Sequence, residues 1–256
     1  MLKLVVGFIL CIVITPNIAF AEQILTTLRD DADNTIFDGK WTFLQEWKST
    51  SEDIVEYDDG TKFVIKTGHD YENLYVLIDF ITDTSFDKSA DRGIVCFDTK
   101  MNRGSIPDKD DYCFSVVLGS QRAITLQGGH FLAQKGYWIR TENHPNLIAV
   151  GNISDKNDRY TSIPHSTYEF KIPLEAIGRS DMYGFYVGVY DVKSHKEYSW
   201  PKYIANERYP YVSAPDKWGE LISPDKSIPE FNLPILLVTL AFLPMILLTR
   251  LKIGRS

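Results

Sequence analysis

The chain has 256 residues, of which 44% are hydrophobic and 24% are charged, and its net charge at pH 7 is −7. Four basic residues (Lys3, Arg250, Lys252 and Arg255) lie in its two apolar ends, so the stretch from 22 to 230 carries −11 without them. Such an acidic surface disfavours nucleic acid as a partner, because phosphates are bound through Lys and Arg. It suits divalent cations and solubility, and about 200 residues are enough for one β-sandwich with its own core.

The first 21 residues have the pattern of a secretory signal peptide. Lys3 precedes an apolar run from 4 to 14, Pro16 ends it, and the AFA sequence at 19–21 is a small-x-small cleavage pattern. The apolar run is too short to cross a bilayer comfortably. We expect the mature chain to begin at Glu22, outside the cytoplasm; a retained membrane anchor is the alternative.

The opposite end has the pattern of one membrane span. Residues 231–249 carry no charge and have nearly the length that a helix needs to cross the hydrocarbon core. Residues 224–230 form a Pro- and Ser-bearing linker before this span, and residues 250–256 form a basic tail after it. By the positive-inside rule that tail lies in the cytoplasm, so the N-terminal domain is predicted to be extracellular.

The Pro-Glu-Phe motif at 229–231, with the apolar stretch and basic end that follow, resembles the PEF-type C-terminal sorting signals of archaeal surface proteins. That resemblance implies processing by an archaeosortase and transfer to another anchor. Asn232 stands where one version of the signal usually has Gly, which leaves a retained membrane helix as the alternative. Either outcome places the protein at the cell surface.

Between 22 and 223, short β-type runs alternate with turn residues. Tyr, Phe, Val and Ile alternate with polar residues in these runs, and Gly, Asn, Asp or Pro separate them. The one helical signal is a single turn in PLEAIG, 173–178. Many strands without helices between them predict an all-β fold, an antiparallel β-sandwich of jelly-roll type over 22–223. The runs are 61–70, 73–83, 93–99, 113–119, 123–129, 137–142, 147–154, 166–173 and 183–192.

Five segments of this region, in order, resemble family 9 carbohydrate-binding modules and the wider DOMON-like group. The resemblance implies a non-catalytic module that binds glycans or cell-envelope polysaccharide, and the two ends of the chain predict that it is anchored at the surface. Because one fold serves many functions, a structural or haem-carrying electron-transfer surface domain is the alternative. The segments are FDGKWTFLQEW (37–47), DYENLYVLIDFITD (70–83), GIVCFDT with DDYCFSV (93–99 and 110–116), STYEFKIPLEAIG (166–178), and YSWPK with PDKWGEL (198–202 and 215–221).

No catalytic motif accompanies this resemblance. GxSxG, HExxH and phosphate-loop patterns are missing from the sequence, and we do not expect an enzyme, although glycosidase carboxylates leave no local signature. Haem-binding relatives use an axial Met with His or Lys; Met101 and Met182 are the candidates here, without a CxxCH motif, and haem is not expected. No metal is assigned to the histidines, which show no ligand-pair spacing: His69, His130, His144, His165 and His195.

Sugar binding calls for an aromatic face with polar groups beside it. Trp138 is the predicted stacking ring, with an ordinary half-buried strand as the alternative, and Trp41 beside the Asp38-Gly39 turn is a second candidate. Trp47 and Trp218 close the first and last motifs, and we expect both to plug the sandwich. The predicted ligand-binding residues are Trp138, Tyr137, Arg140, Glu142, Asn143 and Trp41.

Two acidic runs are candidate calcium sites, because calcium prefers six to eight hard oxygen ligands supplied by loops. The predicted metal ligands, in loop 98–111, are Asp98, Asp108, Asp110 and Asp111. Likeness to sugar-binding modules, which often hold structural calcium, supports them. A second run precedes the first motif: Asp30, Asp31, Asp33 and Asp38. Neither run has EF-hand spacing, and a solvated acidic loop is the alternative.

Two covalent modifications are predicted. Cys11 leaves with the signal peptide, whereas Cys96 and Cys113 lie in successive apolar runs of an exported domain. We predict a disulfide between them, with two buried free thiols as the alternative. Asn152 begins the single N-glycosylation sequon, credible on a domain that faces outward.

Overall fold

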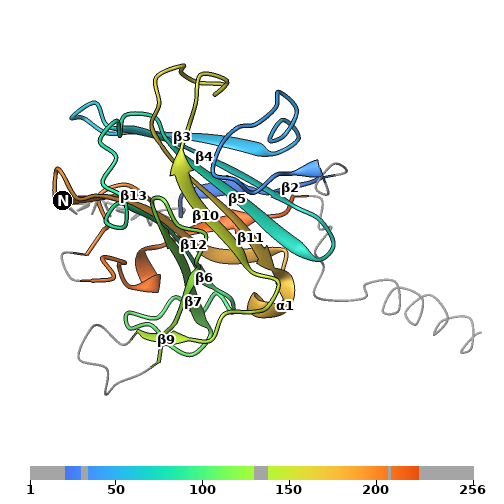
Figure 1. Cartoon of the computed structure of the whole chain (residues 1–256). Coiled ribbons are helices and arrows are strands. Elements are labelled where there is room, and N and C mark those ends of the chain that lie inside the picture. Colours follow the sequence, from blue (N-terminus) through green and yellow to red (C-terminus); the bar gives the residue numbers. More distant parts are fainter. Residues whose placement is uncertain (1–20, 30–33, 130–137, 207–208, 225–256) are drawn as a thin grey trace, which may run out of the picture.

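The computed structural model describes residues 21–29, 34–129, 138–206 and 209–224. Over these residues the chain forms two β-sheets that pack face to face, which confirms the predicted sandwich (Figure 1). Each of the nine predicted runs overlaps one of the strands β4 to β12. The predicted helical turn is α1 (Leu174–Ile177), and a 3₁₀ turn, η2 (Pro215–Lys217), follows late in the chain.

The strands divide into an eight-stranded and a six-stranded sheet. The larger sheet has the order β1-β14-β12-β6-β7-β8-β9, with β13 also paired to β12. Its strands are β1 (Gln23–Leu25), β6 (Arg92–Asp98), β7 (Asp111–Val117), β8 (Ile124–Gln127), β9 (Ile139–Thr141), β12 (Met182–Asp191), β13 (Lys196–Trp200) and β14 (Gly219–Ile222). The smaller sheet has the order β10-β11-β5-β4-β2, with β3 also paired to β4. Its strands are β2 (Thr27–Leu28), β3 (Ser51–Glu56), β4 (Lys62–His69), β5 (Asn73–Phe80), β10 (Ile148–Ile153) and β11 (Ser166–Pro173).

The sandwich is not wholly antiparallel, which corrects the sequence-based prediction. β1 pairs in parallel with β14 and β2 pairs in parallel with β4, whereas the other described pairs are antiparallel. The N-terminal segment therefore joins both sheets. These strands have three and two residues, too few to produce a readable alternation of apolar and polar residues.

Side-chain alternation along the strands creates three apolar layers rather than one. In β6, Val95 and Phe97 point into the main core between the sheets, while Ile94 and Cys96 belong to a second cluster. That second cluster lies on the outer face of the eight-stranded sheet. A third covers the outer face of the six-stranded sheet and contains Trp41, Trp47, Tyr75 and Leu77.

The predicted disulfide between Cys96 and Cys113 is confirmed. The two cysteines are directly opposite one another in the β6–β7 pair, and their sulfur atoms are bonded. The bond lies in the second apolar cluster, outside the main core.

The structure does not describe residues 1–20 or 225–256. The predicted signal peptide, except for its last residue, and the predicted membrane span and basic tail therefore lie outside the described residues. Among the residues that the structure describes, we find no helix with the length and apolar character of a membrane span.

Candidate functional site

The Asp38-Gly39 turn holds the segment 37–47 against the outer face of the six-stranded sheet. Gly39 has φ +75° and its N–H donates to the buried carboxylate of Glu169 at 2.6 Å. A Cβ at Gly39 would lie 2.4 Å from the Cβ of Asn152, so only glycine fits. The Trp47 indole N–H donates to the same carboxylate at 3.1 Å, and its ring is fully buried. The predicted structural role of Trp47 is confirmed, but Trp47 covers the outer face of the six-stranded sheet and does not plug the core between the sheets.

Trp41, the second predicted stacking ring, is buried as well. The edge of Tyr160 packs on it with ring centroids 6.1 Å apart, and Lys66 Nζ lies 5.5 Å from the ring centre. Asp38 caps the local turn by accepting from Lys40 N–H at 3.0 Å. Sugar stacking on Trp41 would therefore need these covering side chains to move, and it stays a prediction.

Trp138 is 7% exposed, so the prediction that its ring is exposed is wrong. It directly precedes β9, and its ring stacks on that of Trp218 with centroids 6.4 Å apart and planes 12° from parallel. Both rings belong to the cluster that contains the Cys96–Cys113 disulfide. Trp138 is buried because a second apolar layer covers the outer face of the sheet here. The segment after β13 forms this cover next to the edge strand β9. The predicted structural role of Trp218 is confirmed, but Trp218 belongs to this outer cluster and does not plug the core between the sheets.

The other residues predicted around Trp138 do not surround a free ring. Arg140 and Glu142 are exposed, and Tyr137 lies outside the described residues. Asn143 is used within the fold: its Oδ1 accepts from Thr125 N–H at 3.1 Å and its Nδ2 donates to Ala123 O at 2.8 Å. We predicted that these residues bind a ligand because we expected Trp138 to be exposed. Trp138 is buried, so ligand binding by these residues stays a prediction that has lost its main support.

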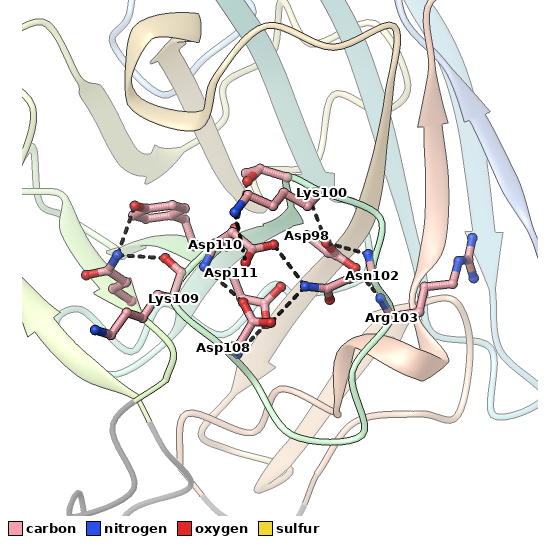
Figure 2. Close-up of polar contacts among 11 residues, drawn as sticks. Asp98, Lys100, Asn102, Arg103, Asp108, Lys109, Asp110 and Asp111 are labelled. Atoms are coloured by element: carbon pink, nitrogen blue, oxygen red, sulfur yellow. Dashed lines mark hydrogen bonds and ion pairs between the residues drawn. The ribbon is translucent and has the colours of Figure 1, made fainter.

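The acidic loop cluster consists of Asp98, Asp108, Asp110 and Asp111 and joins the ends of β6 and β7 (Figure 2). Asp98 and Asp111 are directly opposite one another across the strand pair. One oxygen each of Asp98, Asp110 and Asp111 lies within 4.8 Å of the others, so three of the four predicted ligands converge. Asp108 is linked to them through Asn102, whose Nδ2 donates to Asp108 Oδ2 at 2.7 Å and to Asp110 Oδ2 at 3.3 Å.

This cluster leaves one buried oxygen unsatisfied. Asp111 Oδ2 accepts from Asp108 N–H at 2.7 Å, whereas Asp111 Oδ1 is buried and has no hydrogen-bond partner among the described residues. Burial raises the pKa of Asp111 to about 8, and the charges of Asp98, Asp108 and Asp110 act in the same direction. The nearest ammonium group, Lys100 Nζ, is 3.9 Å from Asp110 Oδ1. These carboxylates are hard oxygen ligands with little positive charge near them, and calcium prefers such a site.

A second candidate site is a pocket that we call the tyrosine pocket. Its volume is about 450 Å³, and it lies between the β3–β4 turn, the β12–β13 turn and the segment that follows β13. Its lining includes Tyr57, Asp59, Lys196, Tyr203, Asn206 and Tyr211.

Aromatic rings and hydrogen-bonding groups meet in this pocket. Tyr203 is 63% exposed, and its ring packs edge-on against Tyr57 with centroids 4.8 Å apart. Its hydroxyl donates to Asp58 Oδ2 at 3.0 Å. Tyr203 and Tyr211 have φ of +64° and +69°, a region that bulky residues rarely adopt and that recurs at binding sites. Asp59 Oδ2, which accepts from Lys196 Nζ at 3.2 Å, adds a charged pair to the lining.

Arg92 packs against tyrosine rings at the tyrosine pocket. Its guanidinium lies 4.8 Å from the ring centre of Tyr211 and 5.2 Å from those of Tyr190 and Tyr209. It also pairs with Glu197 Oε2 at 3.1 Å, with both side chains almost entirely buried. Burial raises the pKa of Glu197 to about 7 although Arg92 acts against that rise.

The sequence-based analysis missed the tyrosine pocket. A signal was present, because four tyrosines occur between 198 and 211: Tyr198, Tyr203, Tyr209 and Tyr211. The rings of Tyr198 and Tyr203 meet that of Tyr57 only through the fold, because Tyr203 is 146 residues after Tyr57 in the chain.

The remaining residues that we singled out are the glycosylation candidate, the two methionines and the second acidic run. Asn152 lies in β10 and its Nδ2, the atom that would carry a glycan, donates to Asp38 O at 2.8 Å, so glycosylation stays a prediction. Met101 lies in the loop after β6 and Met182 begins β12. Asp30, Asp31 and Asp33 lie outside the described residues.

Comparison with known proteins identifies the fold. No protein-family model matches the chain, and no curated protein matches it. Two solved structures of a family 9 carbohydrate-binding module from Caldicellulosiruptor kristjanssonii are similar, each with 14% identity over 82% of this chain and 100% of the other. The TM-score is 0.50 for the complex with cellotriose and 0.51 for the complex with glucose. At this identity the likeness shows a fold similar to that of a family 9 module.

Proposed function

We propose that this protein is a non-catalytic carbohydrate-binding module and that the tyrosine pocket binds the saccharide. The observation that carries the proposal is the exposed ring of Tyr203 beside a pocket with charged and amide groups. A sugar presents C–H groups on one face and hydroxyl groups at its edge, so it is recognised by an aromatic ring with polar groups around it. Structures of similar fold that hold cellotriose and glucose support this choice of ligand class.

Tyr203→Ala tests the proposal. Glucose, cellotriose and a panel of envelope-type polysaccharides are titrated into the full chain by calorimetry. We expect wild-type protein to bind at least one of them, and Tyr203→Ala to weaken binding by about tenfold or more, equivalent to about 1.4 kcal/mol. The melting temperature should change little, because an exposed ring contributes little to stability.

Tyr71→Ala is the matched control. Tyr71 is 64% exposed, against 63% for Tyr203, but it lies in the β4–β5 turn and does not line the tyrosine pocket. It should bind as wild type does. Absence of binding to every saccharide would overturn the function, and equal losses in the two variants would overturn the location.

We further propose that the module is displayed at the cell surface after loss of residues 1–21, held by the C-terminal segment or transferred by an archaeosortase. The support is the sequence pattern of both ends. N-terminal sequencing of protein from its native host should begin at Glu22, and protease added outside intact cells should digest the domain. A sequence that begins at Met1 would exclude this arrangement.

The acidic loop cluster is a second proposed site, for calcium. The buried Asp111 Oδ1 without a partner favours it, because a cation would satisfy that oxygen. Calcium should raise the melting temperature of EDTA-treated protein, and Asp111→Asn should remove most of that rise. Asp155→Asn, in the β10–β11 loop of the six-stranded sheet, is the control and should respond as wild type. A calcium response that is unchanged in Asp111→Asn would exclude the site.

A further inference from the structure

Asp79, Asp158 and His165 form a buried group on the outer face of the six-stranded sheet. Asp79 is in β5, His165 directly precedes β11, and Asp158 lies in the β10–β11 loop. One ligand atom from each residue lies within 4.8 Å of the others. Their side chains are at most 1% exposed, which separates this group from an ordinary solvated acidic cluster.

The histidine is oriented as a metal ligand. Its Nδ1 lies 2.8 Å from Ile163 O, a group that only accepts, and 2.9 Å from the Ser154 hydroxyl, which can accept as well as donate. We therefore assign the hydrogen to Nδ1, which then donates to the Ile163 carbonyl. In the neutral ring this leaves the lone pair on Nε2. Nε2 contacts Asp79 Oδ1 and lies 3.8 Å from Asp158 Oδ2. Metal-binding imidazoles show this arrangement, with the second nitrogen donating to a backbone carbonyl.

The carboxylates are also arranged for a ligand. Asp158 Oδ1 accepts from Tyr160 N–H at 2.8 Å, which leaves Oδ2 directed at His165. Asp79 Oδ2 is buried and receives no hydrogen bond from the described residues. Thr167 is directly opposite Asp79 across the β5–β11 pair, and its buried Oγ1 likewise has no partner in that part of the chain. Two unsatisfied oxygens at neighbouring positions indicate a missing partner.

Charge leads to the same conclusion. Among the described residues, Asp79 and Asp158 form ion pairs with His165 alone. Two buried carboxylates beside one imidazole leave a net negative charge out of water, which is unfavourable unless a cation compensates it. A divalent ion supplies that charge.

We propose that Asp79, Asp158 and His165 bind one first-row divalent metal ion, with Zn²⁺ as the best match. One imidazole nitrogen with two carboxylate oxygens suits Zn²⁺, whereas Ca²⁺ and Mg²⁺ prefer oxygen ligands alone. Zinc ligands lie about 2.0–2.2 Å from the ion, so two of them are about 3.3 Å from one another in a tetrahedral site. His165 Nε2 and Asp79 Oδ1, which are in contact, would move apart to admit the ion, and Asp158 Oδ2, 3.8 Å from Nε2, would move slightly closer. The ion ties the β10–β11 loop to β5 and thereby fixes Tyr160 over Trp41.

The experiment uses the full chain, stripped with a chelator. Zn²⁺ is titrated in the presence of excess Ca²⁺, which occupies the acidic loop cluster first. We expect one equivalent of Zn²⁺ to bind and the melting temperature to rise. Co²⁺ in place of Zn²⁺ should give visible absorption bands of a low-coordinate nitrogen–oxygen site. Absence of Zn²⁺ binding in the presence of this Ca²⁺ would overturn the proposal.

Asp158→Asn locates the site, because its Oδ1 can still accept from Tyr160 N–H and keep the turn. Zn²⁺ affinity should fall by more than about tenfold in this variant. Asp155→Asn is the matched control: Asp155 is in the same loop, and its Oδ1 accepts from Asn157 N–H at 2.8 Å. Equal affinities in the two variants would overturn the assignment. If Asp158→Asn does not fold, His165→Gln in the Co²⁺ experiment decides, since retention of the absorption bands would exclude His165 as a ligand.

Discussion

The indole N–H of Trp47 donates to the carboxylate of Glu169 at 3.1 Å, and the backbone N–H of Gly39 donates to the other oxygen of the same carboxylate at 2.6 Å. One buried acid on β11 thus fixes both ends of the first tryptophan-bearing motif. The two tryptophans of that motif cover a sheet face.

Replacement of Trp47 tests this role. Trp47→Ala should lower the free energy of unfolding by about 3–5 kcal/mol, because a fully buried aromatic ring is lost. Trp47→Phe should lower it less, since it keeps most of the packing and loses the hydrogen bond to Glu169. Urea titrations of both variants measure the difference. Wild-type stability in Trp47→Ala would contradict the packing that we describe.

Trp138 should behave as a structural residue. It is buried and stacked on Trp218, so Trp138→Ala should cost on the order of 3 kcal/mol of stability. Saccharide binding by the folded fraction should be retained, because Trp138 does not line the tyrosine pocket. Thermal denaturation followed by calorimetric titration separates the two effects. A Trp138→Ala variant that melts like wild type and fails to bind sugar would restore the ring as a ligand contact.

The Cys96–Cys113 bond should contribute measurably to stability. The cysteines are 17 residues apart in sequence, and closing a loop of about that length restricts the unfolded chain by about 3 kcal/mol. A Cys96→Ser, Cys113→Ser double variant should melt at a lower temperature than oxidised wild type. Thiol labelling of denatured, unreduced wild type should find neither cysteine free; labelling at both would contradict the bond.

The Glu197 carboxyl predicts a pH dependence of stability. Its pKa is raised from 4.5 to about 7 by burial, so the folded protein holds this proton more tightly than the unfolded chain does. The contribution to stability is therefore complete below pH 4.5 and is lost as pH rises from there through 7. Within that window the loss is at most about 1.4 kcal/mol for each pH unit.

Glu197→Gln should flatten this part of the curve, as measured by urea denaturation at a series of pH values. The exposed Glu142→Gln is the control and should follow wild type. An unchanged slope in Glu197→Gln would assign the pH dependence to other groups.

Local patterns in the sequence determined much of this fold. Alternation of apolar and polar residues located strands β4 to β12, because a half-buried strand repeats every two residues. The disulfide followed because its cysteines lie in successive strands. Three of the four predicted metal ligands in loop 98–111 converge because β6 and β7 are neighbours, so that the loop brings their ends together.

Contacts between distant segments were decided only by the tertiary structure. An alternating pattern shows that Trp138 points to one face of a sheet, but a second apolar layer determines that this face is covered. Histidines without ligand-pair spacing gave no metal signal, yet His165 meets Asp79, 86 residues away, on an adjacent strand. Strand pairing is free to join residues at any separation, and so both the buried histidine–aspartate group and the tyrosine pocket arise from the fold and not from local sequence.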